Sequence, residues 1–377
     1  MERGAPNFFS MSSKPTMPNG RQANIDDLYS DAINLLKGLI AIPSFSKEED
    51  KTAAYLEIFF QQKNIKTNRY LNNVWATNKY FDSSKPTILL NSHHDTVKPN
   101  KGFTLNPFEP IEKEGKLYGL GSNDAGGPLV SLLATFVHFY EEDIPFNIVV
   151  AATAEEEISG KNGIEILLPQ LPKIDCAIVG EPTLLNMAVA EKGLLVLDCT
   201  AHGTAGHAAR NEGVNALYIA VKDIEWLSTY QFPKVSSLLG PVHIAVTSIS
   251  TENKTHNIVP SECSFLVDIR VNELYSFEEI ISVIKENIKS EIHPRSIRLK
   301  SSFINQDHPL VKAGIQLGIS TYGSPTCSDM ALMPFPSLKI GPGDSARSHS
   351  ADEFIYVDEI RKGINTYVEL LKKLFFN

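Results

Sequence analysis

Histidines and carboxylates in this sequence follow short apolar runs, at positions where buried strands are expected to end. The run PTILL predicts a strand that ends at about Asn91, and the H-x-D triplet His93, His94 and Asp95 follows it. In open α/β sheets, ligands bind beyond the carboxyl ends of the strands. A metal-binding His also needs an acceptor that fixes its tautomer, commonly a carboxylate. Three polar residues in a loop are the alternative interpretation, and the rest of the chain decides between the two.

The same arrangement recurs at three later apolar runs. FNIVVAAT leads into the acids Glu155 to Glu157, IDCAIV ends just before Glu181, and FPSLKIG is followed after a short loop by His349. Between the first two runs, Asp124 lies in a Gly-rich turn before an apolar helix. Each residue alone could belong to a solvated acidic turn, a turn cap or a helix N-cap. Their repeated placement at successive strand ends instead favours one shared site.

These strand ends and turns supply two imidazoles and three carboxylates that could bind metal: His93, Asp124, Glu157, Glu181 and His349. Nitrogen and oxygen ligands of this kind suit zinc above other divalent ions. Five ligands are more than one four-coordinate ion takes. They therefore predict two ions that share a bridging carboxylate, at a separation of about 3.5–4 Å.

From about Ile25 to its C-terminus, the chain resembles the dizinc deacylase and peptidase superfamily. That superfamily includes acetylornithine deacetylase, succinyl-diaminopimelate desuccinylase, carboxypeptidase G and aminoacylase. The motifs that carry the resemblance are SHHDTV, GSNDAGG, TAEEE, VGEPT and SHSADEF. The resemblance implies that the five residues above are zinc ligands and that Asp95 orients His93. It also implies that Asp124 bridges the ions before a cis peptide bond, and that Glu156 is the general base.

The resemblance assigns further roles in the second half of the chain. GTAGHAAR matches the family motif G-x-x-G-H, so His207 is expected to reach a partner subunit's zinc site and polarise the scissile carbonyl. Asn257 and Arg270 resemble positions that hold a substrate carboxylate, which suits the planar fork of Arg. Arg270 could equally be an ordinary arginine at a strand end. Lys192 lies where relatives often carry a different basic residue, so its role stays open.

The order of the elements predicts an α/β catalytic domain that is split by an inserted domain. Residues 25–188 and 303–377 are expected to form a mostly parallel sheet with helices on both faces. Residues 189–302 follow a β-α-β-β-α-β order with alternating apolar residues, typical of a ferredoxin-like α+β unit. In the family this unit is a lid and the usual dimer interface. Residues 1–24, rich in Pro, Ser, Gly and Asn, predict a disordered leader.

Local signals place two helix starts and the last strand of the inserted domain. Ser46 with Glu49 predicts a capping box, and Ser276 with Glu279 predicts a second one. The final strand of the inserted domain is expected at the run SIRLKS.

Composition restricts the classes of function. The 377 residues, of which 42% are hydrophobic, suffice for a sizeable core and fit two domains. A net charge of −9 argues against nucleic acid or an anionic membrane as a partner. The sequence has no apolar stretch of about 18 residues that would predict a membrane span. Four scattered cysteines predict reduced thiols in a cytoplasmic protein.

The resemblance implies a zinc-dependent hydrolase that cleaves the amide of an N-acyl amino acid, with two Zn²⁺ ions for which Co²⁺ is an expected substitute. Glu156 would take a proton from the attacking water and deliver it to the leaving amine. The runs SPTCSDMALM and KIGPGDSARSHSADEF resemble the arginine-biosynthesis branch, so N-acetylornithine or N-acetyl- or N-succinylcitrulline is the expected substrate.

Three alternatives remain open. A dizinc dipeptidase or carboxypeptidase would share all five ligands, and so would a succinyl-diaminopimelate desuccinylase. A metal-free binding or scaffold protein with the same fold is disfavoured, because every ligand and Glu156 are present.

Overall fold

The computed structural model describes residues 24–210 and 212–376, so the predicted leader lies outside the described residues except for Asn24. The chain divides into two compact units. The first unit comprises the chain up to Val189, Ile304–Tyr322 and the chain from Met333; the inserted unit comprises Ala190–Phe303 and Gly323–Leu332. Within the described residues, no helix is both long enough and apolar enough to span a bilayer.

The central sheet has nine strands in the order β1-β2-β6-β3-β7-β17-β8-β15, with β16 beside β8. The strands are, in chain order, β1 (Asn68–Tyr70), β2 (Asn73–Thr77), β3 (Thr87–His93), β6 (Asn147–Thr153), β7 (Cys176–Val179), β8 (Met187–Glu191), β15 (Ser302–Phe303), β16 (Thr321–Ser324) and β17 (Ser337–Lys339). The four central strands β6, β3, β7 and β17 are parallel, and antiparallel strands flank them. The predicted α/β class is confirmed, with a mixed sheet whose centre is parallel.

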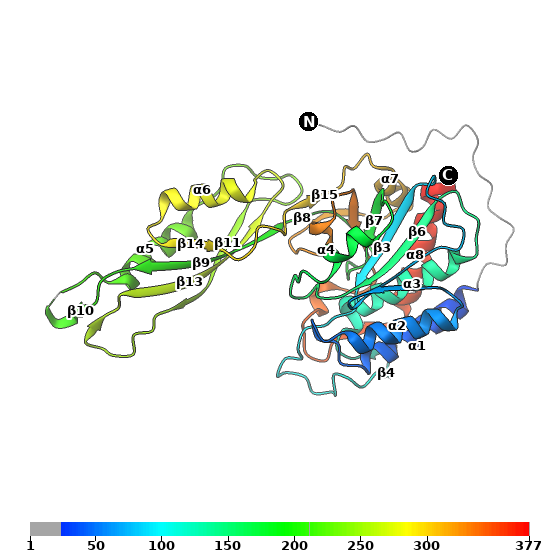
Figure 1. The fold of residues 1–377 in the computed structure, drawn as a ribbon, viewed down its shortest axis with the longest axis horizontal. Coiled ribbons are helices and arrows are strands. Elements are labelled where there is room, and N and C mark those ends of the chain that lie inside the picture. Colours follow the sequence, from blue (N-terminus) through cyan, green and yellow to red (C-terminus); the bar gives the residue numbers. More distant parts are fainter. Residues whose placement is uncertain (1–23, 211, 377) are drawn as a thin grey trace. The chain divides into compact units, whose positions relative to one another are not determined.

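The sheet centre is buried because its strands are continuous apolar runs. Every residue of β3, β6 and β7 is buried, as expected for parallel strands covered on both faces. The long helices of this unit are α1 (Ile25–Ile40), α2 (Asp50–Gln62), α3 (Gly127–Tyr140), α7 (Pro309–Gln316) and α8 (Val357–Phe376). Helix α3 packs against β3 and β6 and also against α1 and α8 (Figure 1). Because it is covered on almost every side, α3 is apolar nearly all round.

Short elements complete the first unit. They are β4 (Ile111–Lys113), β5 (Lys116–Tyr118), β18 (Phe354–Tyr356), α4 (Ile164–Leu167), the π-helical turn η1 (Ser122–Gly126), and the 3₁₀ turns η2 (Leu168–Gln170) and η5 (Ser345–Arg347). The strands β18, β5 and β4 form a separate small sheet.

The inserted unit has the ferredoxin-like order β9-α5-β11-β13-α6-β14. Its elements are β9 (Gly193–His202), α5 (Ala216–Thr229), β11 (His243–Ser250), β13 (Glu262–Val271), α6 (Phe277–Asn287) and β14 (Glu291–Pro294). The four strands form an antiparallel sheet in the order β11-β13-β9-β14. Alternate residues of β9 and β13 are buried in a core with α5 and α6, separate from that of the first unit. The remaining elements are β10 (Gly206–His207), η3 (Ala208–Arg210), β12 (Ile258–Val259) and η4 (Asp329–Leu332).

Two local predictions are corrected and one is confirmed. Helix α2 begins at Asp50 without a side-chain cap, because Ser46 donates its hydroxyl to Asp95 instead. The predicted strand at SIRLKS is wrong: the last strand is β14, which pairs with β9 directly after α6. The second capping box, at Ser276 and Glu279, is confirmed.

The inserted unit also contains residues 323–332, which the sequence assigned to the catalytic domain. Hydrogen bonds attach these residues to the first residues of the inserted unit. The Lys192 amide donates to the carbonyl of Ser324, and the Ser328 hydroxyl donates to the Glu191 carboxylate at 2.9 Å.

Candidate metal centre

The five predicted metal ligands all lie in the first unit. His93 is the last residue of β3, Glu157 follows β6, and Glu181 follows β7. Because β6, β3 and β7 are adjacent parallel strands, their carboxyl ends bring these three side chains to one edge of the sheet. Asp124 lies in η1 and His349 lies in the loop after η5, and both reach the same place.

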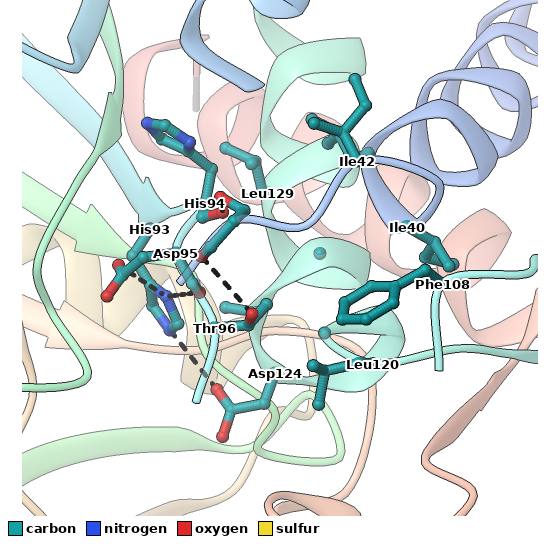
Figure 2. A pocket seen from close by; sticks show the side chains of 15 residues that line it. Ile40, Ile42, His93, His94, Asp95, Thr96, Phe108, Leu120, Asp124 and Leu129 are labelled. Carbon is teal, nitrogen blue, oxygen red and sulfur yellow. Dashed lines mark hydrogen bonds and ion pairs between the residues drawn. The ribbon is translucent and has the colours of Figure 1, made fainter. Parts of the chain in front are cut away.

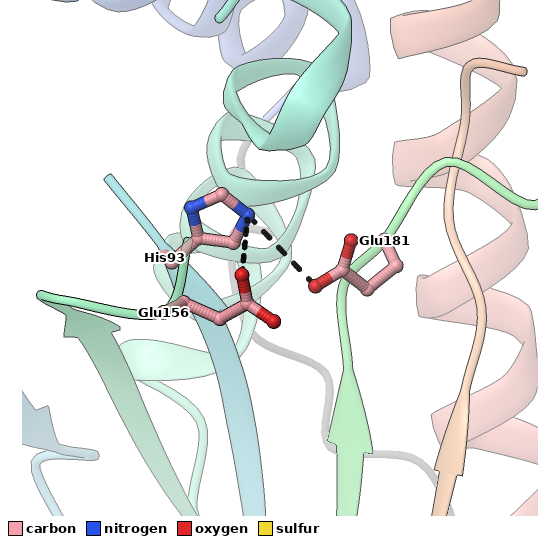
Figure 3. Close-up of side chains that lie close together, drawn as sticks. All are labelled: His93, Glu156 and Glu181. Atoms are coloured by element: carbon pink, nitrogen blue, oxygen red, sulfur yellow. Dashed lines mark ion pairs between the residues drawn. The ribbon is translucent and has the colours of Figure 1, made fainter. Parts of the chain in front are cut away.

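His93 lies at the centre of the cluster. Its Nε2 is 3.4 Å from Asp124 Oδ1 and 3.9 Å from carboxylate oxygens of both Glu156 and Glu181. Figure 3 shows Glu156 pointing toward this nitrogen from below and Glu181 from the right. Two overlapping groups could each hold an ion: His93 with Glu156 and Glu181, and His93 with Asp124 and Glu157.

Asp124 faces two histidines with its two oxygens. Oδ1 lies toward His93, while Oδ2 lies 3.8 Å from Nε2 of His349. The same nitrogen of His349 is 2.9 Å from Oε2 of Glu157. This is the placement that a carboxylate bridging two ions requires. The peptide bond between Asp124 and Ala125 is cis, as the resemblance implied.

The electrostatics of the cluster fit a bound cation. His93 is 1% exposed, and its Nε2 has no hydrogen-bond partner among the described residues. Burial lowers the pKa of His93, but the carboxylates of Asp124 and Asp95 outweigh burial and hold that pKa well above its ordinary value. Hydrogen bonding to Glu157 raises the pKa of His349 to about 9. Carboxylates gathered round the buried His93 and the more exposed His349 demand positive charge, which divalent ions at these donors would supply.

Asp95 connects the H-x-D motif to the acidic turn. His93 Nδ1 lies 3.0 Å from the carbonyl oxygen of Asp95, and only a protonated Nδ1 can donate to it. In the neutral ring this hydrogen bond keeps the proton on Nδ1, so that Nε2 is the nitrogen available to a metal. The Asp95 carboxylate also accepts the amides of Glu156 and Glu157, at 3.1 and 3.2 Å. Asp95 therefore contacts the predicted ligand His93 through its carbonyl, and it holds the predicted base Glu156 and the predicted ligand Glu157 through its carboxylate.

The loop between α1 and α2 supports this arrangement, which the sequence did not predict. Ser46 donates to Asp95 at 2.7 Å. Glu49 is buried and accepts the amide of Glu155 at 3.2 Å and the side-chain amide of Asn72 at 2.9 Å. The local signal was ambiguous, because S-x-x-E before a helix also describes a capping box.

A small cavity lies beside the cluster. It measures about 20 Å³, about the room that one water needs. Figure 2 shows Ile40, Phe108 and Leu120 on the far side of it from His93, with Asp124 below. Apolar walls next to the ligands keep the local dielectric low and strengthen the interactions of charges in the site.

His94 does not join the cluster. Its ring nitrogens lie 2.9 Å from the Thr52 hydroxyl and 2.9 Å from the Asn72 carbonyl. Burial lowers the pKa of His94 to about 4, so it is a packed, neutral histidine.

Within the inserted unit, His207 and Asn257 are neighbours. His207 is exposed on β10, which pairs with β12, and the amide of Ala208 donates to the carbonyl of Asn257 at 3.0 Å. Arg270 lies near the other end of this unit's sheet, where it pairs in register with Leu194. Its guanidinium forms two hydrogen bonds to Asp268, at 2.8 and 3.0 Å. Of the three predicted substrate-contacting residues of this unit, His207 and Asn257 are therefore neighbours. Arg270 lies apart from them, in an ion pair with Asp268.

Lys192, whose role the sequence left open, also lies in the inserted unit. Its Nζ donates to the carbonyl of Pro241 at 2.7 Å, and burial lowers the pKa of this lysine. This contact gives Lys192 a structural partner within its own unit.

Comparisons with known proteins agree on one family. The sequence profile of peptidase family M20/M25/M40 matches residues 89–373. The succinyl-diaminopimelate desuccinylase of Rickettsia bellii (strain OSU 85-389) is 26% identical over 372 residues, which cover 89% of this chain and 95% of the relative. The enzyme of the same name from Buchnera aphidicola subsp. Cinara cedri is 26% identical over 389 residues, covering 92% and 100%.

Solved structures show the same fold. A tripeptidase from Staphylococcus aureus has a TM-score of 0.76 and 21% identity, with 93% of this chain and 99% of that chain covered. An M20 family metallo-carboxypeptidase from Sulfolobus solfataricus has a TM-score of 0.75 and 18% identity, covering 91% and 99%.

Proposed function

The chain belongs to peptidase family M20/M25/M40, and from this premise we propose that it is a dizinc hydrolase that cleaves the amide bond of an N-acyl amino acid. The observation that carries the proposal is the placement of Asp124, whose two oxygens face His93 and His349. Zinc is proposed because the donors are imidazole nitrogens and carboxylate oxygens, which it accepts readily.

The donor set divides into two half-sites. His93, Asp124 and Glu181 would hold one ion, and Asp124, Glu157 and His349 would hold the other. Two bound ions would lower the pKa of a shared water toward neutrality and polarise the scissile carbonyl.

Glu156 is the proposed general base. Its carboxylate lies 3.9 Å from Nε2 of the proposed ligand His93, and its backbone amide donates to the Asp95 carboxylate. From this position it would accept the proton of the attacking water and deliver it to the leaving amine. The products are a carboxylate and a free amino acid.

For the acyl group, the relatives favour a different candidate from the expected arginine-biosynthesis substrates. The two curated relatives described above are both named succinyl-diaminopimelate desuccinylase, and each matches over about nine-tenths of this chain. We therefore propose an N-succinyl amino acid with a second carboxylate as the first substrate to test. N-acetylornithine and the acylcitrullines follow, and the peptidase names of the structural neighbours justify peptides as a third arm.

A substrate panel tests this proposal. The protein, loaded with Zn²⁺ or Co²⁺, is assayed for release of free amine from N-succinyl-diaminopimelate, N-acetylornithine, N-acetylcitrulline, N-succinylcitrulline, and di- and tripeptides. The highest kcat/KM is expected for an acyl amino acid. Hydrolysis of peptides alone would make the chain a peptidase, and no hydrolysis with two bound ions would refute the proposal.

We also propose a homodimer formed through the inserted unit, with His207 acting in the partner's site. Two surface features of this unit support it. Strand β11 lies at an edge of its sheet with all of its residues at least partly exposed, and edge strands offer unpaired backbone groups. Helix α5 exposes Tyr218 and Val221, apolar side chains that a second copy could cover. All four cysteines are free, which supports the cytoplasm as the location.

A further inference from the structure

Glu353 is a buried carboxylate for which the proposed reaction has no use. It is 2% exposed and lies four residues after His349, just before β18. Its Oε1 accepts the backbone N–H groups of Asn123 and Asp124, each at 2.9 Å. Its Oε2 accepts the N–H of Gly121 at 3.0 Å. One side chain therefore holds three amides in and next to η1, the turn that carries Asp124.

The same turn holds the Glu353 loop in return. The side-chain oxygen of Asn123 accepts the amide of Asp344 at 3.0 Å, and its nitrogen donates to the carbonyl of Asp344 at 3.0 Å. His349 lies between these two attachment points, and its own carbonyl accepts from the Asn100 side chain at 3.0 Å. The backbone of the His349 loop is thus joined to η1 at both ends.

We propose that Glu353 is a positioning residue that fixes Asp124 relative to His349, so that the two form a preorganised half-site for metal. This inference rests on the proposed metal-dependent function. Glu353 would touch neither ion nor substrate, and it would act through the backbone of η1. A ligand held in place before binding costs less ordering when the ion arrives, so loss of Glu353 should weaken metal binding.

The chemistry of the contact explains why a carboxylate stands here. All three partners are N–H donors, and a carboxylate is acceptor-only with two oxygens. Gln at this position would keep one oxygen but turn an NH₂ group toward an N–H that needs an acceptor. Asp would be shorter by one carbon–carbon bond, about 1.5 Å, and could not span the same gap. Glu353→Gln is therefore the informative substitution, because it keeps the shape and removes one acceptor.

Asp223 offers a matched control in the inserted unit. It is also a buried carboxylate, and it accepts the amides of Lys289 and Ser290 together with the Ser290 hydroxyl, the last at 2.6 Å. Asp223→Asn makes the same chemical change to a similar hydrogen-bond set outside the metal centre. It should lower the melting temperature without changing metal affinity.

The experiment titrates Zn²⁺ into metal-free full-length protein against a chromophoric chelator, for wild type, Glu353→Gln and Asp223→Asn. Partners behind metal ligands typically contribute about 10–100-fold to affinity, so Glu353→Gln should weaken one of the two ions by about tenfold or more. Excess Zn²⁺ should restore most of its kcat, which a general loss of folded protein would not allow. If Glu353→Gln does not fold, Asn123→Ala tests the same connection and should weaken the same ion.

Unchanged zinc affinity in Glu353→Gln, or an equal loss in Asp223→Asn, would overturn the inference. A wild-type chain that bound no ion would overturn both this inference and the proposed function. Two tightly bound ions without hydrolysis of any amide would overturn only the proposed function.

Discussion

Asp124 is the side chain on which both proposed half-sites depend, because each of its oxygens faces a different histidine. Glu181, by contrast, lies on the His93 side. The two carboxylates should therefore respond differently to removal. Asp124→Ala should bind less than one ion per chain, whereas Glu181→Ala should keep about one of two. Metal content after dialysis, measured by mass spectrometry, checks this, and activity should disappear with chelation and return with Zn²⁺ or Co²⁺. Equal metal content in the two variants would contradict a bridging role for Asp124.

Glu156 is expected to act on protons rather than on metal. Glu156→Gln keeps the size and one oxygen of the side chain but cannot accept and deliver a proton, so kcat should fall by about 10²–10⁴-fold. Zinc content and melting temperature should stay near those of the wild type. The kcat measured on the best substrate of the panel, with zinc content determined on the same sample, provides the test. Near wild-type turnover in a zinc-loaded variant would remove Glu156 from the mechanism.

At the scale of elements, two serines that each begin an S-x-x-E pattern before a helix make different hydrogen bonds. Ser276 caps α6 in a reciprocal capping box, whereas Ser46 donates to Asp95 and leaves α2 without a side-chain cap. Ser276→Ala should lower the free energy of unfolding by about 1 kcal/mol and leave kcat/KM unchanged. Ser46→Ala should instead lower kcat/KM, by up to about tenfold, because Asp95 loses a donor that orients it.

Urea unfolding and steady-state kinetics on both variants separate the two roles. The reverse pattern, with Ser46→Ala mainly less stable and fully active, would show that Ser46 serves the helix after all. Each variant is the other's control, because both remove one serine hydroxyl. The Ser46 hydroxyl donates to Asp95, and the Ser276 hydroxyl accepts the amide of Glu279.

The elements themselves could be predicted where the signal is local. Strands β3, β6 and β7 are buried on both faces, so their sequences are nearly continuous apolar runs. Such runs can be recognised in the sequence without knowledge of the fold. The sequence prediction missed strand β14 because only Ile292 of its four residues is buried, so apolar and polar residues do not alternate along it.

Local sequence signals point to the proposed ligands, but they do not point to the residues that support them. His93 and Glu181 follow strong strand signals, so their position in the chain gives their position in the sheet. Ser46 acts on a residue 49 positions away, and Glu353 on amides 229 to 232 positions away. Contacts at such separations are set by how loops pack, and no short motif records them.

At the scale of the whole molecule, the two units have separate cores, and the chain crosses between them after residues 189, 303, 322 and 332. The sequence placed the inserted domain at residues 189–302 and predicted no later crossing. Because the proposed metal ligands all belong to the first unit and His207 belongs to the inserted unit, the two can be altered independently. His207→Ala should therefore cost turnover and leave zinc affinity unchanged, since a single donor to an oxyanion typically contributes about 10²–10³-fold to kcat.

Subunit mixing tests whether His207 works in the partner's site. A chain with His207→Ala and a chain with Glu156→Gln should each be nearly inactive alone. In a mixed dimer, one of the two sites combines an intact Glu156 with an intact His207 from the other chain. Random exchange of equal amounts makes half the dimers mixed, so activity should return to about one quarter of the wild type. Separate labels on the two chains must show that hybrids form. Labelled hybrids that stay inactive would mean that His207 acts within its own chain or takes no part in the reaction.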